Sequence, residues 1–207
     1  MSQIDLSLVK DIVSILGTIG ALTFGAIGLS TWRRQLRGTA EYEVAKKALC
    51  LTYEVQDAIR AVRSPMMYLR QEEVEAGRAL QEEQRIYQER LNRLEAKWSE
   101  LRTVILESRV IWGAEAENRF VALRERIATL HSEIWLHFWL KGAYAAPWAT
   151  VDRSPERVTA NDRAIYFVSE EDDFSKEVNV AVCRVEKFFE NRVRRSPKRQ
   201  SDKGEGT

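Results

Sequence analysis

Residues 12–32 read IVSILGTIGALTFGAIGLSTW, a stretch of apolar and small residues without a charged side chain. A helix rises about 1.5 Å per residue, so this stretch is long enough to cross a hydrocarbon core about 30 Å thick. The residues before it include Asp5, Lys10 and Asp11 rather than the basic start of a cleaved signal peptide. We therefore expect a retained, single transmembrane helix whose partner is membrane lipid.

The residues that flank this span predict its orientation. Trp32 ends the span at the level where aromatic side chains meet lipid headgroups. The bases Arg33, Arg34 and Arg37 follow it, and before the span Lys10 is the only base. Because basic flanks stay on the cytoplasmic side, we expect the N-terminus outside the inner (plasma) membrane and the following domain in the cytoplasm.

One face of the predicted span consists of small residues, which lie close together when the sequence is plotted at 100° per residue. They are Ser14, Gly17, Gly20, Ala21, Gly25 and Gly28. Such a face lets two membrane helices approach closely, so it predicts a homo-oligomer or contact with another membrane protein. The alternative is that glycine is simply frequent in membrane helices.

The composition of the whole chain is typical of an all-α protein. Charged residues make up 30% of the sequence, and there are only 10 Gly and 4 Pro. A net charge of +1 lacks the basic excess of a dedicated nucleic-acid-binding protein. We divide the chain into a transmembrane anchor with its basic flank (1–37), a cytoplasmic helical domain (38–195) and a disordered tail (196–207).

Apolar periodicity predicts a four-helix-like arrangement in the cytoplasmic domain. Three of the expected helices span residues 41–63, 115–141 and 173–194, and residues 142–161 are expected to form a connecting loop. The remaining helix is long and coiled-coil-like, because apolar residues recur in heptads from Leu80 to Ile105. Its seam consists of Leu80, Tyr87, Leu91, Leu94, Trp98, Leu101 and Ile105. The sequence leaves open whether this seam pairs within the fold or between chains.

Two histidines are present, and His131 is the better candidate for chemistry. On a helix, Arg124 lies about 20° from His131, whereas Arg126 lies about 140° away. A histidine that exchanges protons with a ribose hydroxyl, beside an arginine that holds the phosphate, is sufficient for metal-independent RNA cleavage. The alternative is a packed, hydrogen-bonded structural histidine at the edge of the apolar face.

Other kinds of site find little support in the sequence. No HExxH motif or Cys/His cluster predicts a metal site, and no glycine-rich phosphate loop or nucleophile elbow occurs, so we expect no metal and no cofactor. Trp135, Trp139 and Trp148 belong to an aromatic group that predicts either core packing or an anchor for a protein partner. The basic tail favours either simple solvation or contact with anionic lipid or RNA, and it consists of Arg192, Arg194, Arg195, Lys198 and Arg199.

Three features together resemble one bacterial family. They are the WRRQLRGTAEYEVAKKAL run (32–49) after a membrane span, the spacing from Arg124 or Arg126 to His131, and EEDDFSKEV (170–178) at the last helix. The chain resembles the membrane-anchored, HEPN-like proteins, of the type found as accessory membrane proteins of type VI CRISPR systems. The resemblance implies a helical domain that assembles at the membrane during phage defence, and a ribonuclease site formed by two protomers if catalysis is retained.

These observations favour a membrane-anchored, self-associating helical protein that acts as an accessory or effector at the cytoplasmic face. One alternative is a membrane-tethered ribonuclease that uses His131 and one of the two arginines. The other is a structural scaffold built on the coiled-coil-like helix.

Overall fold

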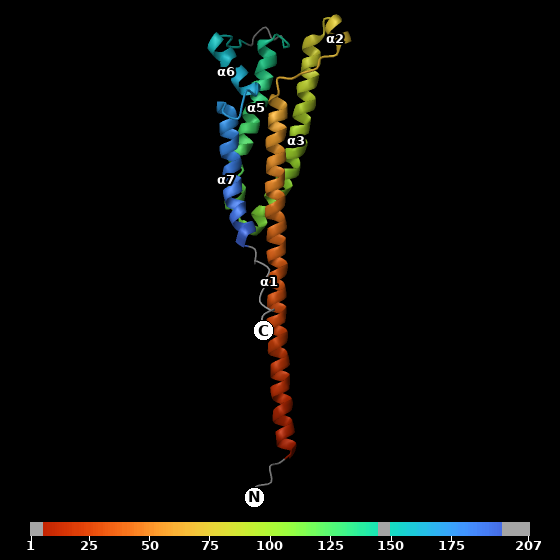
Figure 1. Ribbon diagram of the computed structural model, residues 1–207, viewed down its shortest axis with the longest axis vertical. Coiled ribbons are helices and arrows are strands. Elements are labelled where there is room, and N and C mark those ends of the chain that lie inside the picture. Colours follow the sequence, from red (N-terminus) through yellow and green to blue (C-terminus); the bar gives the residue numbers. More distant parts are fainter. Residues whose placement is uncertain (1–5, 145–149, 196–207) are drawn as a thin grey trace, which may run out of the picture.

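The computed structural model describes an all-α architecture, and no strand occurs within the residues that it describes (Figure 1). Those residues are 6–144 and 150–195, with the backbone alone described for 6–15, 19, 21, 191, 194 and 195. The expected tail, 196–207, lies outside this description.

The first helix, α1 (Leu6–Arg63), is 58 residues long and joins the predicted membrane span to the first helix of the bundle. We expected a new helix to begin near Glu41, but none does. No proline occurs before Pro65, and Gly38 alone costs about 1 kcal/mol in a helix interior. An ion pair of 2.9 Å between Arg37 Nε and Glu41 Oε1 bridges this region. The expected boundary between the anchor and the helical domain, at residue 37, therefore lies inside one continuous helix.

Figure 1 shows that α1 has two different environments along its length. Its N-terminal half extends beyond the bundle as a single helix, and its C-terminal part lies between α3 (Ala79–Trp112) and α7 (Asp173–Arg195). Among the described residues, no helix offers a segment long and apolar enough to span a membrane. Part of the expected span, residues 12–15, 19 and 21, lies outside the residues whose side chains are described.

The bundle core is formed by the C-terminal part of α1 together with α3, α5 (Val121–Leu140) and α7. From α1 the core receives Ala45, Ala48, Leu51, Val55, Ile59 and Val62. On α3, the apolar seam packs in the same core, and its members Leu94 and Leu101 are fully buried. The coiled-coil-like helix is therefore paired within the chain, mainly with α1.

Short elements connect the long helices, and two of them differ from expectation. Helix α3 ends at Gly113, whose φ of 75° suits glycine, as its position predicted. The helix expected over 115–141 is interrupted, because α4 (Ala114–Asn118) ends before α5 starts. The interruption leaves Phe120 buried, with its ring centroid 5.7 Å from that of Phe189 on α7.

The expectation of a loop over 142–161 was wrong for its last seven residues, which belong to α6 (Pro155–Ile165). Ser154 caps this helix by accepting a hydrogen bond of 3.3 Å from the backbone N–H of Arg157. Pro155 occupies the first turn, where its missing N–H has no partner to lose. The remaining connector, α2 (Gln71–Glu75), is a single turn before α3.

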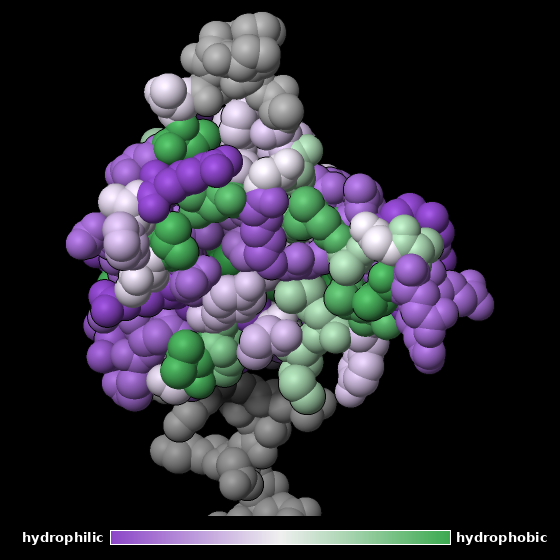
Figure 2. Space-filling view, turned by 90° about the horizontal axis from the view of Figure 1, so that it is seen from above, coloured by the Kyte–Doolittle hydropathy of each residue, from purple (hydrophilic) through white to green (hydrophobic). Residues whose placement is uncertain are grey.

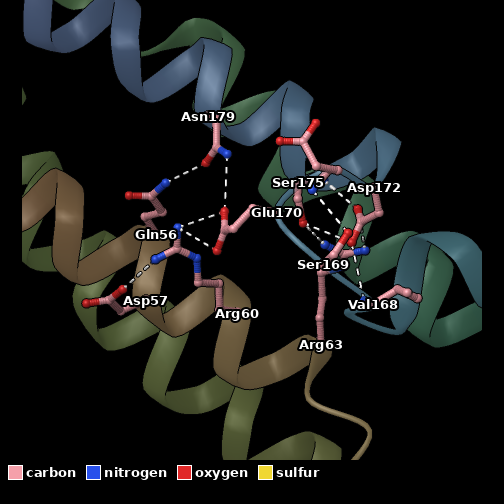
Figure 3. Close-up of polar contacts among 11 residues, drawn as sticks. Gln56, Asp57, Arg60, Arg63, Val168, Ser169, Glu170, Asp172, Ser175 and Asn179 are labelled. Carbon is pink, nitrogen blue, oxygen red and sulfur yellow. Dashed lines mark hydrogen bonds and ion pairs between the residues drawn. The ribbon is translucent and has the colours of Figure 1, made fainter.

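Arg63, the last residue of α1, holds the segment between α6 and α7 in place (Figure 3). Its guanidinium donates to Ser175 Oγ at 2.8 Å and to Asp172 Oδ1 at 3.0 Å. It also donates to the carbonyl oxygens of Arg163, Ala164 and Tyr166. A buried cation is stable only when its donors are satisfied, and these contacts satisfy them.

Candidate functional site

The groove between α3 and α5 is the candidate functional site, because the two helices make only sparse contact along their length. Two cavities lie in this groove, one of about 450 Å³ and one of about 460 Å³. The first, which we call the upper cavity, is lined by Gln84, Gln88, His131 and Trp135 among others. The second, the lower cavity, is lined by Trp98, Arg102, Phe120 and Arg124 among others.

His131 lies in the upper cavity, half-buried. Its Nε2 atom is 2.9 Å from Glu95 Oε1 of α3, which is an ion-pair distance. The contact is not a hydrogen bond, and this buried nitrogen has no hydrogen-bond partner among the described residues. Beside it, the rings of Trp135 and Tyr144 lie nearly parallel, 24° apart with centroids at 6.3 Å. The histidine therefore has a carboxylate neighbour and an aromatic wall.

The two candidate arginines have different surroundings. Arg126 is ion-paired with Glu177 of α7 and so turns away from the groove. Arg124 is exposed in the lower cavity and has no hydrogen-bond or ion-pair partner among the described residues. Arg124 and His131 each line a cavity together with residues of α3. They line different cavities, separated by seven residues or about 10 Å along the helix axis.

His137 is the histidine that the sequence analysis left aside, and its side chain is almost fully buried. Its Nε2 atom lies 3.1 Å from Glu83 Oε1, and Lys141 Nζ donates to the same carboxylate at 2.7 Å. Burial raises the pKa of Glu83, but the hydrogen bonds from His137 and Lys141 outweigh it and leave this pKa below its ordinary value. The ring of Tyr166 packs edge-on against His137.

These contacts give His137 a structural role. No local signal could have found this cluster, because Glu83 and His137 are 54 residues apart in sequence. A packed, hydrogen-bonded structural histidine, the alternative expected for His131, is found at His137.

The exposed half of α1 is the second feature with functional potential. A Cβ atom built on Gly17, Gly20, Gly25 or Gly28 meets nothing within 4 Å, so this face is open in the single chain. The side chains of Ser14 and Ala21 lie outside the described residues. Beyond this face, Trp32, Arg33 and Arg34 are exposed, and Arg37 pairs with Glu41.

No family model matches this chain, and no curated protein or solved structure is significantly similar to it. A function is therefore inferred from two features of the structure, the groove between α3 and α5 and the exposed half of α1.

The end of the bundle that lies away from the N-terminal half of α1 has a surface of both polar and apolar residues. Figure 2 looks onto this end and shows apolar residues scattered among polar ones. Exposed apolar side chains near it include Met66, Tyr68, Val74 and Val168. Because polar residues separate the apolar ones, this end does not form one continuous apolar patch of the kind that marks a docking site.

Proposed function

We propose that the protein is a single-pass membrane protein whose cytoplasmic bundle is held at the inner membrane and self-associates there, as an accessory or effector of a larger response. In this proposal the N-terminal half of α1 crosses the bilayer with the N-terminus outside. The small-residue face forms the contact between copies. The resemblance to membrane-anchored, HEPN-like defence proteins favours a role in phage defence.

The observation that carries the proposal is the exposure of large apolar side chains along the free half of α1. Leu22 is 69% exposed and Phe24 is 78% exposed, and Leu16 and Ile27 are also exposed. Leaving one such side chain in water rather than burying it costs roughly 1.5–3 kcal/mol. A row of them on a helix outside the bundle is explained when lipid covers the helix.

Self-association is supported by the open glycine face on the same helix. Gly17 and Gly25 lie within about 80° of one another, and neither has a neighbour within 4 Å of an added Cβ. Packing against a second copy of α1 would use this space, because small residues let backbones approach closely. A larger side chain at these positions disturbs no contact within one chain, so its effect on assembly is a direct readout of contact between chains.

The test compares the wild-type chain with the double variant Gly17→Leu/Gly25→Leu and with Ala26→Leu. Ala26 lies on the opposite side of the helix, about 180° from Gly17, so leucine there adds bulk without filling the proposed contact. Each chain is expressed in bacteria, extracted with alkaline carbonate, and sized in an uncharged detergent by light scattering. A reporter fused to either terminus gives the topology.

We expect all three chains to resist carbonate extraction, with the N-terminus outside. The wild type and Ala26→Leu should form the same oligomer, and the double variant should be smaller. Release of the wild-type chain by carbonate would contradict a transmembrane anchor. An unchanged oligomer size in the double variant, or a monomeric wild type, would contradict assembly through the small-residue face.

The two alternatives have weaker support. A ribonuclease needs Arg124 and His131 to act on one phosphodiester, but they line different cavities within a single chain. RNA cleavage by the wild type that His131→Ala abolishes would restore this alternative. A scaffold that pairs through the Leu80–Ile105 seam needs a free seam, whereas these residues pack against the core of their own chain.

A further inference from the structure

The lower cavity brings two unpaired arginines to one place. Arg102 of α3 and Arg124 of α5 both line it, and neither has a hydrogen-bond or ion-pair partner among the described residues. Both side chains are exposed, so their guanidinium groups are accessible from solvent. From the sequence, Arg124 is a candidate only together with His131, and Arg102 has no expected role.

Several arginines elsewhere in the bundle are engaged by carboxylates. Arg63 pairs with Asp172, Arg85 with Glu82, Arg126 with Glu177, and Arg157 with Glu133. The lower cavity also contains an acid, Glu117, but Arg109 Nη1 holds its carboxylate at 2.9 Å. Because Arg109 compensates Glu117, the charges of Arg102 and Arg124 have no carboxylate partner in the lining, and an anion placed there would balance them.

Apolar side chains form one part of the lining of this cavity, beside its polar and charged residues. Trp98 and Phe120 are buried core residues whose side chains form part of the lining, and Leu106 at the margin is 59% exposed. At about 460 Å³, the cavity is within the range of small-molecule sites. A ligand that fits this lining has an anionic group and an apolar or planar part.

We propose that the lower cavity binds a soluble organic phosphate, with the phosphate group between Arg102 and Arg124 and the organic part against Trp98 and Leu106. A phosphomonoester carries a charge of about −2 near pH 7, which matches two guanidinium groups. The planar fork of arginine also suits phosphate oxygens better than a lysine does. This site is independent of the membrane anchor, and it requires no catalysis.

The test uses the full-length chain in an uncharged detergent, with adenosine monophosphate, inorganic phosphate and adenosine as probes. Binding is measured by calorimetry and by tryptophan fluorescence. The chain has 6 tryptophans, so a Trp98→Phe variant identifies the contribution of the residue in the cavity. Adenosine has the same base and sugar as the nucleotide but lacks the phosphate, and inorganic phosphate lacks the organic part.

We expect saturable binding of the nucleotide, weaker binding of phosphate and no binding of adenosine. Arg102→Gln and Arg124→Gln should each weaken nucleotide affinity roughly tenfold or more, because each removes a charge-assisted hydrogen bond. Arg102→Lys keeps the charge and should retain more affinity than Arg102→Gln. The matched control is Arg184→Gln on α7, an exposed arginine outside the cavity, which should bind as the wild type does.

Circular dichroism of each variant shows whether the bundle remains folded. The proposal is overturned if the nucleotide does not bind up to millimolar concentration, or if adenosine binds equally well. Equal affinity in Arg102→Gln, Arg124→Gln and Arg184→Gln would also overturn it, since binding would then lie elsewhere. Loss of the fluorescence change in Trp98→Phe, with calorimetric binding retained, places the ligand at this wall.

Discussion

Arg63 Nη2 lies 3.0 Å from Asp172 Oδ1, and this ion pair joins the end of α1 to the residue before α7. Arg63 is 1% exposed and Asp172 is 14% exposed, so water hardly reaches either side chain (Figure 3). Ser175 reinforces the pair, because its backbone N–H donates to the same Asp172 oxygen at 2.8 Å. One carboxylate thus receives the guanidinium and also caps the first turn of a helix.

Removing this carboxylate should destabilise the bundle. In Asp172→Ala the guanidinium of Arg63 stays buried without its counterion, which we expect to lower the free energy of unfolding by about 2–4 kcal/mol. Urea denaturation followed by circular dichroism measures this. Glu171→Gln is the control, because Glu171 is 84% exposed and its removal should cost little. Equal effects of the two changes would contradict a stabilising role for the pair.

The same pair predicts a dependence of stability on pH. Burial raises the pKa of Asp172, but hydrogen bonds from Ser175 and Arg63 outweigh this and hold the pKa below its ordinary value. Its contribution to stability is therefore complete above the unfolded-state pKa of about 3.9, and is lost as the pH falls through the lower folded-state pKa. Unfolding measured from about pH 7 down to about pH 3 should show the wild type converging on Asp172→Asn. A constant difference between the two across this range would count against this linkage.

The two histidines should respond differently to truncation. His137→Ala removes a buried ring and its contact with Glu83, so we expect a loss of roughly 2–4 kcal/mol in the free energy of unfolding. His131→Ala affects a half-buried ring and should cost less than about 1 kcal/mol. Denaturation of both variants under one condition checks the order. If His131→Ala were the more damaging change, His131 would be the structural histidine.

The coiled-coil-like seam gives a fourth prediction. Leu94→Ala and Leu101→Ala each leave a cavity in the core of the bundle and should cost about 2–5 kcal/mol. Because the seam packs within the chain, the folded variants should keep the oligomer size of the wild type in detergent. Val110→Ala on the same helix is the control, since Val110 is 87% exposed, and it should be nearly neutral. A smaller oligomer in Leu94→Ala would indicate that the seam pairs between chains.

Helix periodicity was sufficient to predict the all-α class, the break at Gly113 and the helix that begins at Asp173, because each depends on local sequence. The signal for α6 was also local, in Ser154-Pro155, but Gly142 and Pro147 nearby favoured a loop. The continuity of α1 was not predicted, because the basic residues after the apolar stretch indicate where a membrane span ends. They do not indicate where a helix ends, since arginine favours helix.

Side-chain partners were harder to predict. Arg63 and Asp172 are 109 residues apart in sequence, and Arg126 meets Glu177 across two helices. Such pairs depend on how helices pack, and periodicity describes only which face of each helix is buried. The angle between Arg124 and His131 follows from their spacing on one helix, but which residues of α3 line a cavity with each of them depends on how the two helices pack.

An unbroken helix of 58 residues is also a lever about 87 Å long. With no joint between its free half and the bundle, a tilt of about 5° at one end would move the other end by roughly 8 Å, given that length. Arg63 lies at the end of α1 that is packed in the bundle and contacts the residue before α7, so the helix and the bundle would tilt together. The orientation of the whole bundle is thereby coupled to the orientation of the free half of α1.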